Sequence, residues 1–296
     1  MNIIQNKTLI ALSFLSLCTM LTACSADDEQ TMNTDGRSVR QLSIAEVPLT
    51  RATLTDNANT LAAAWKAGDH ATYLNLSSFT SYTMDFGTLT ASSSEATSAF
   101  TGEVRCIMGD KVAFLYPATS PIYVGEDRGK FTISLAGQKG TLADMAQRFH
   151  YVYGVAEVTS VTENTATATC AQMKSLLVAC KFRFRDGSEN PIPVKTLSIS
   201  YGTDLSAGFP QTYHLAPHTD PDQVSVPYNL ASAGTPLSIN LDTETTDGVY
   251  VALFPISGQT LFFSVTNTAG TYTGTASATL KAGRFYPATI KLEKES

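Results

Sequence analysis

A pattern of two strand-like elements occurs twice in this chain and favours an all-β fold. The apolar runs 112–117 and 251–255 both end in proline, and each is followed by an alternating segment, 131–135 or 261–265. A continuous apolar run is typical of a buried strand, and alternation is typical of a strand with one buried face. The repetition therefore predicts two β-sandwich domains built on one plan.

The composition is consistent with a fold rich in β-strands, and it limits the classes of function that the chain can have. Charged residues make up 16% of the 296 residues, below the roughly 25% of ordinary soluble domains, and Thr and Ser take their place. A Thr-rich chain with 12 Tyr and 14 Phe favours strands over helices. The net charge of −6 argues against nucleic acid, which requires clustered Lys and Arg. One Trp and four His leave little material for a metal or acid–base site, so recognition of macromolecules is favoured over catalysis.

The first residues resemble the export signal of a bacterial lipoprotein. Lys7 is the only charge in the first 26 residues, and the apolar segment 9–21 is too short to cross a bilayer comfortably. It ends in Leu-Thr-Ala-Cys, which resembles a lipobox, with cleavage between Ala23 and Cys24. Residues 1–23 are thus predicted to be a signal peptide, and Cys24 to carry the lipid, palmitate included, that holds the protein in the outer membrane. The alternative is an ordinary signal peptide with an incidental cysteine.

The remaining chain divides into a tether and two domains. Residues 24–40 are polar and predict a flexible tether, and the acidic run 27–29 resembles the surface-export signal of Bacteroidetes lipoproteins. Residues 41–185 and 186–296 are the predicted N-terminal and C-terminal β-sandwich domains. The boundary is expected near residues 170–195, a region in which Asp-Gly at 186–187 is a hairpin signal.

Three segments have clear local signals. Residues 42–49 carry four aliphatic side chains with a slip at Glu46, which predicts one bulged strand ending near Pro48. Thr141 can cap a helix whose apolar residues recur with a helical period. The last strand, 286–292, has an alternating apolar face.

Five segments taken together are similar to the fimbrillin family of Bacteroidetes, the lipoprotein subunits of type V pili. They are the lipobox at Cys24 and the segments 49–53, 65–69, 250–255 and 280–286. The order and spacing of these segments, more than any one of them, carry the resemblance. It covers almost the whole chain and implies two transthyretin-like β-sandwiches in tandem.

The resemblance also implies a mechanism of assembly. An Arg-specific protease removes the N-terminal strand after export, and the open groove accepts a strand from a neighbouring subunit. Segment 42–49 has the character of the removed strand, which places the cleavage between Arg51 and Ala52; Arg37 and Arg40 are rival positions. The implied partners are other fimbrial subunits, the outer membrane and host surface ligands. The alternative is a surface lipoprotein that binds glycans or host ligands without polymerising.

Other candidate sites are weak. His214 and His218 have the spacing of a helical metal pair, but the prolines around them predict a loop, and the acidic segments 220–222 and 242–244 lack the full calcium-loop pattern. Trp65 could stack on a sugar but is more typical of a Trp packed on a turn. No nucleophile elbow or phosphate loop is found in the sequence. We therefore expect no enzyme activity, no cofactor and no metal.

Three cysteines of the mature chain follow Cys24. They are Cys106, Cys170 and Cys180. An odd number cannot form a complete disulfide framework, so at most one pair is possible and buried thiols in strands are favoured.

Overall fold

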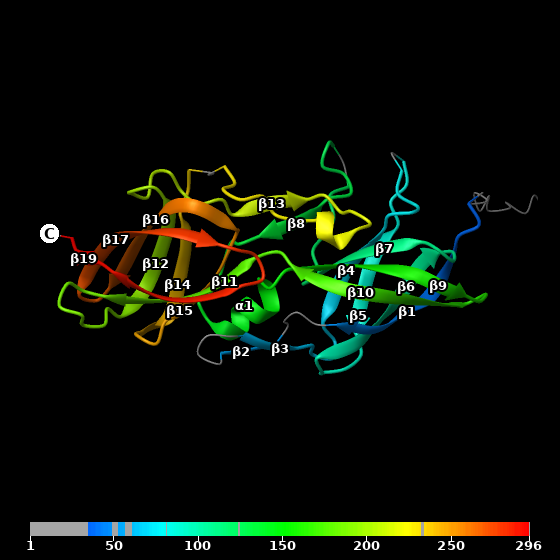
Figure 1. Ribbon diagram of the computed structural model, residues 1–296, viewed down its shortest axis with the longest axis horizontal. Coiled ribbons are helices and arrows are strands. Elements are labelled where there is room, and N and C mark those ends of the chain that lie inside the picture. Colours follow the sequence, from blue (N-terminus) through cyan, green and yellow to red (C-terminus); the bar gives the residue numbers. More distant parts are fainter. Residues whose placement is uncertain are drawn as a thin grey trace, which may run out of the picture. The chain divides into compact units, whose positions relative to one another are not determined.

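The computed structural model describes residues 35–48, 53–56, 61–80, 82–123, 125–231 and 234–295 (Figure 1). Arg37–Ser296 forms one compact unit. Strands dominate it, which confirms the predicted all-β class. Ala23, Cys24, Leu49, Arg51 and Ala52 lie outside the described residues.

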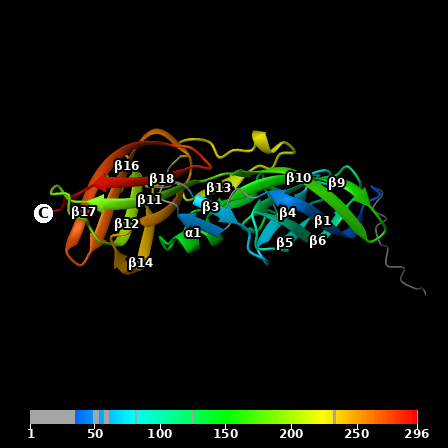
Figure 2. The same cartoon turned by 60° about the horizontal axis from the view of Figure 1, so that its bottom comes forward.

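Seven strands of the N-terminal half close into a barrel (Figure 1, Figure 2). In order around the barrel these are β1 (Ser38–Pro48), β10 (Thr165–Ser175), β9 (Val152–Val161), β7 (Lys111–Tyr116), β4 (His70–Asn75), β5 (Phe86–Ala91) and β6 (Thr97–Cys106). The closure differs from the predicted sandwich of two separate sheets. Its cause is β1, which pairs in parallel with β10 on one side and antiparallel with β6 on the other.

The C-terminal half contains two sheets. One has the order β15 (Val249–Leu253), β11 (Val178–Arg185) and β18 (Phe285–Lys291); the other has the order β14 (Leu237–Thr245), β12 (Val194–Tyr201), β16 (Ile256–Asn267), β17 (Gly270–Leu280) and β19 (Glu293–Lys294). The rings of Phe182 and Phe184 in the first sheet lie 5.2 and 6.0 Å from the ring of Phe263 in the second. The apolar faces of the two sheets thus pack on each other, as in a sandwich.

The predicted boundary at 185/186 falls immediately after β11. That strand pairs with β15 and β18, so its ladder partners all come from later in the chain.

Short elements lie outside the barrel and the two sheets, and one of their pairings connects the two halves. β8 (Phe131–Ser134) pairs with β13 (Thr212–Leu215), β2 (Thr53–Asp56) pairs with β3 (Leu61–Ala64), and η1 (Pro221–Gln223) is a 3-10 turn. The buried Gln138 side chain donates to the Ala252 carbonyl at 2.9 Å and accepts from its N–H at 2.7 Å. The repeated sequence pattern therefore has different surroundings in its two copies: β8 pairs with β13, whereas β16 lies inside a five-stranded sheet.

The predicted helix is confirmed as α1 (Leu142–Arg148). The hydroxyl of Thr141 accepts a hydrogen bond from the Asp144 N–H at 3.2 Å, as an N-cap does. The Asp144 carboxylate accepts from the Lys139 N–H at 2.8 Å and from Arg148 at 3.0 Å, and Met145 and Ala146 are buried. Among the described residues no helix is both long and apolar enough to span a membrane.

The prediction of buried thiols is also confirmed. Cys106, Cys170 and Cys180 are free and buried. Burial raises the pKa of each thiol, so the reactive thiolate is disfavoured in the folded chain.

Candidate functional site

The strand that closes the barrel, β1, carries a continuous apolar face. Leu42, Ile44 and Val47 are fully buried, whereas Glu46 is exposed. The pairing with β6 shifts between Ile44 and Val47, and Glu46 adopts a φ of 47°. The extra residue returns Val47 to the inward face, which ordinary alternation would have pointed outward. The predicted bulged strand is therefore confirmed over its described residues.

Two ladders hold β1 in the barrel wall. It pairs with β10 from Gln41 to Ala45 and with β6 along most of its length. If β1 left, β6 and β10 would each present a row of unpaired backbone groups. Between them would lie the apolar positions that Leu42, Ile44 and Val47 now fill. Such a groove satisfies the requirements of an incoming strand with the same alternation.

An ion pair anchors the beginning of β1. The Arg37 guanidinium donates from Nε to Asp110 Oδ2 at 2.8 Å and from Nη2 to Oδ1 at 2.7 Å. Asp110 also accepts from the Asn75 amide at 2.9 Å and from the Ile107 N–H at 3.1 Å. Burial raises the pKa of the Asp110 carboxyl, but these hydrogen bonds outweigh burial and hold it below its usual value. This anchor was missed from the sequence, because nothing local links positions 37 and 110.

The arginine side chains at both rival cleavage positions form hydrogen bonds within the fold. The Arg37 side chain is 12% exposed in its ion pair. Arg40 donates to the carbonyl of Thr162 at 2.7 Å and to that of Cys106. A protease that recognises arginine must draw the side chain into its own pocket, so the folded barrel protects these two positions.

Trp65 contacts the other end of β1. It is 1% exposed, and its Nε1 donates to the Val47 carbonyl at 3.2 Å. Its ring meets Phe100 and Tyr116 edge-on at 4.8 and 5.2 Å. A buried ring cannot stack on a sugar, so the interpretation of Trp65 as a packed residue is confirmed.

The two histidines do not form a site together. His214 lies in β13, not in the predicted loop, and contacts Asp127 at 2.7 Å. His218 accepts from the Asp220 N–H at 3.0 Å. Over the described ranges, no group of three or more His, Cys, Asp or Glu residues is arranged to hold a metal ion.

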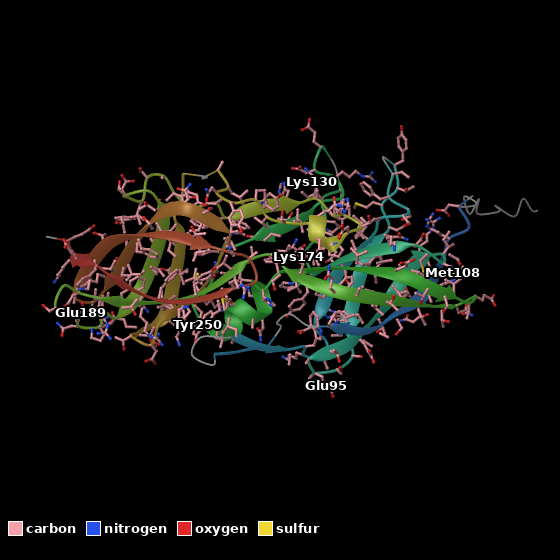
Figure 3. The ribbon with its side chains drawn as sticks, viewed as in Figure 1. Glu95, Met108, Lys130, Lys174, Glu189 and Tyr250 are labelled. Carbon is pink, nitrogen blue, oxygen red and sulfur yellow. The ribbon has the colours of Figure 1, made fainter. Side chains whose placement is uncertain are left out.

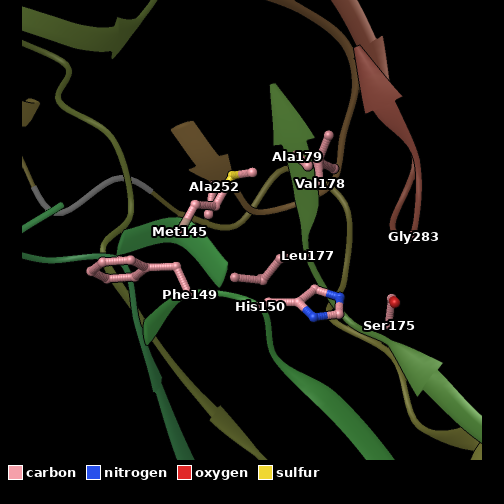
Figure 4. A pocket seen from close by; sticks show the side chains of 9 residues that line it. All are labelled: Met145, Phe149, His150, Ser175, Leu177, Val178, Ala179, Ala252 and Gly283. Atoms are coloured by element: carbon pink, nitrogen blue, oxygen red, sulfur yellow. The ribbon is translucent and has the colours of Figure 1, made fainter. Parts of the chain in front are cut away.

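A small cavity lies beside α1, but it is too small for a ligand. Its volume is 10 Å³, about the space one water molecule needs. Figure 4 shows apolar side chains of α1 and β11 around it, with His150 and Ser175 nearby. The cavity is therefore a gap in packing.

Comparison with known proteins identifies the fold. No family model and no curated protein matches this sequence. A proposed cell adhesion protein from Bacteroides uniformis has a similar structure, with a TM-score of 0.51, 16% identity, and coverage of 88% of this chain and 94% of that chain. A second, from Bacteroides fragilis, has a TM-score of 0.51, 10% identity and the same coverage. A third, from Bacteroides ovatus, has a TM-score of 0.50, 13% identity, and coverage of 86% and 93%.

At these identities the similarity establishes a shared fold. The chain has the fold of Bacteroides proteins proposed to act in cell adhesion. This is consistent with the fimbrillin-like family that the five sequence segments resemble.

Proposed function

We propose that this protein is a structural subunit of surface fimbriae that contributes to adhesion and assembles by strand exchange. Cleavage between Arg51 and Ala52 would release β1, and a strand of a neighbouring subunit would take its place. The observation that carries the proposal is the place of β1: a strand near the start of the chain forms both ladders that close the barrel. The fold shared with the Bacteroides cell adhesion proteins supports it. We also propose that the two halves correspond to the family's two tandem transthyretin-like domains, with the N-terminal one closed into a barrel by β1.

The donor we propose is β18. This strand lies at the edge of its sheet, with β11 as its ladder partner. Tyr286, Ala288 and Ile290 alternate along it and are only partly buried, so β18 has apolar surface that a partner could cover. The rival donor is the region around residues 42–49 itself, which includes most of β1, handed over in trans to the next subunit.

The cleavage site can be tested by blocking it. We expect the wild-type chain to form SDS-resistant ladders under an Arg-specific protease, and an Arg51→Ala chain to remain a soluble monomer. Arg183→Ala is the matched control, because Arg183 is an exposed arginine on β11, and it should polymerise normally. Ladders formed by Arg51→Ala with residues 42–49 still attached would contradict the cleavage and favour the rival donor.

We further propose that Cys24 anchors the subunit in the outer membrane, exposed at the cell surface. Its acyl chains would provide stable attachment. A Cys24→Ala chain should move to the soluble fraction, whereas Cys18→Ala, within the preceding apolar segment, should not. Unchanged membrane partition of Cys24→Ala would refute the anchor.

A further inference from the structure

A pocket between the two halves is lined by three cations, and none of the described residues that line it carries a carboxylate. Its volume is 430 Å³, within the usual range of small-molecule sites. Lys174 comes from the end of β10, beside η1 (Figure 3). Lys281 and Arg284 come from the turn between β17 and β18. Three positive side chains around one pocket stand out in a chain whose net charge is −6.

The turn that carries two of these cations is held in place by the fold. Gly283 adopts a φ of 72°, which favours glycine, and its N–H donates to the Leu177 carbonyl at 2.8 Å. The Lys281 N–H donates to the Tyr286 hydroxyl at 3.0 Å. The Arg284 carbonyl accepts from the Ala179 N–H at 3.0 Å. The backbone of the turn is thus bonded on several sides, while the side chains of Lys281 and Arg284 are exposed.

No carboxylate balances these charges within the part of the chain that the structure describes. Lys174, Lys281 and Arg284 make no ion pair there. Lys174 donates to the neighbouring acid Asp222, but through the backbone carbonyl, at 2.9 Å. Their charge is therefore available to an anion from outside.

The rest of the lining provides a flat apolar surface and hydroxyl groups. Tyr228 is 50% exposed, and Pro227 and Pro255 line the pocket with it. A tyrosine has an apolar ring and a polar hydroxyl group, and this combination is suited to contact a sugar ring. Ser175 and Ser225 add hydroxyl groups that can donate and accept.

We propose that this pocket binds an acidic saccharide, with its sulfate or carboxylate group on Lys281 and Arg284 and a sugar ring against Tyr228. Arginine and lysine form their strongest hydrogen bonds with such anions. The site lies away from β1, but its turn leads into β18, the proposed donor strand, so the site is complete only while β18 stays in its own sheet. It can therefore be tested on the uncleaved monomer, where a failure would leave the assembly mechanism untouched.

The test is calorimetric titration of the chain from residue 25 onward at low salt. The probes are a sulfated heparin disaccharide and sialyllactose, with lactose as the neutral control and a short oligoglutamate as the acidic peptide. We expect one or both acidic saccharides to bind, lactose and oligoglutamate to bind far more weakly, and added salt to weaken binding. Binding of one acidic saccharide alone would identify sulfate or carboxylate as the recognised group.

Variants distinguish a specific binding site from nonspecific electrostatic attraction. Lys281→Gln with Arg284→Gln should weaken binding by about tenfold or more, as the loss of two charge-assisted contacts requires. Tyr228→Ala should weaken it as well, an effect that charge alone does not predict. Lys139→Gln with Lys195→Gln removes two exposed charges elsewhere and should leave affinity unchanged. Failure of both acidic saccharides to bind, equal weakening by the control pair, or equal affinity for oligoglutamate would overturn the proposal.

Discussion

Removing β1 should strongly destabilise the barrel, and supplying it again as a peptide should restore stability. Leu42, Ile44 and Val47 are fully buried. At about 1.5–3 kcal/mol each, their burial contributes roughly 4.5–9 kcal/mol as an upper estimate. This is comparable with the whole stability of an ordinary domain, about 5–15 kcal/mol. A chain cleaved at Arg51 and separated from its N-terminal fragment should therefore melt at a much lower temperature.

Trp65 provides a direct measurement of this loss. It is the only tryptophan of the chain, is buried, and is bonded to β1 through Val47. Its emission should shift to the red when β1 departs and return when a peptide of residues 37–48 is added, with a melting temperature that rises with peptide concentration. A peptide with Leu42→Asp and Ile44→Asp is the matched control. A cleaved, separated chain with unchanged emission and melting temperature would contradict this account of the strand.

Breaking the ion pair at the start of β1 should have the second largest effect. Arg37 and Asp110 are 12% and 3% exposed, and removing one partner of a buried pair costs about 3–5 kcal/mol. Arg37→Met should therefore lower the free energy of unfolding by that order and loosen β1 first. The double variant with Asp110→Leu should recover part of the loss, because no charge is left buried alone. A single variant as stable as the wild type would show that the pair does not anchor the strand.

The same pair predicts a dependence on pH. The pKa of the Asp110 carboxyl lies below its usual value in the folded chain. Its contribution to stability is therefore present above the pKa of an unfolded aspartate, about 3.9, and is lost as the pH falls through the lowered folded pKa. Acid should release β1 from the cleaved wild-type chain, and Asp110→Asn should remove this part of the pH dependence. Fluorescence of Trp65 across an acid titration measures both.

The features predicted correctly from the sequence are those whose signal is local. The bulge of β1 follows from the slip at Glu46, and α1 follows from its cap at Thr141 and its helical period. Barrel closure could not be predicted, because β1 pairs with β10, more than a hundred positions later, and alternation shows which face is buried but not which strand is the neighbour.

The anchor and the basic pocket were missed for the same reason. Asp110 is 73 residues from Arg37, and Lys174 lies far along the chain from the turn at Lys281. In each case the fold, and not a sequence motif, brings the side chains together. The repeated strand pair shows that a local pattern does not determine its neighbours, because its two similar copies pair with different strands in the fold.

The central claim, that β1 must leave before subunits join, can be tested most directly by locking it. Ser43 in β1 is paired with Thr101 in β6, so Ser43→Cys with Thr101→Cys would place two thiols on adjacent strands, and oxidation could join them. We predict that the oxidised chain, treated with an Arg-specific protease, is cleaved but stays a monomer. Adding a reductant to the same sample should then produce SDS-resistant ladders. Equal ladders from the oxidised and reduced samples would contradict strand exchange at β1.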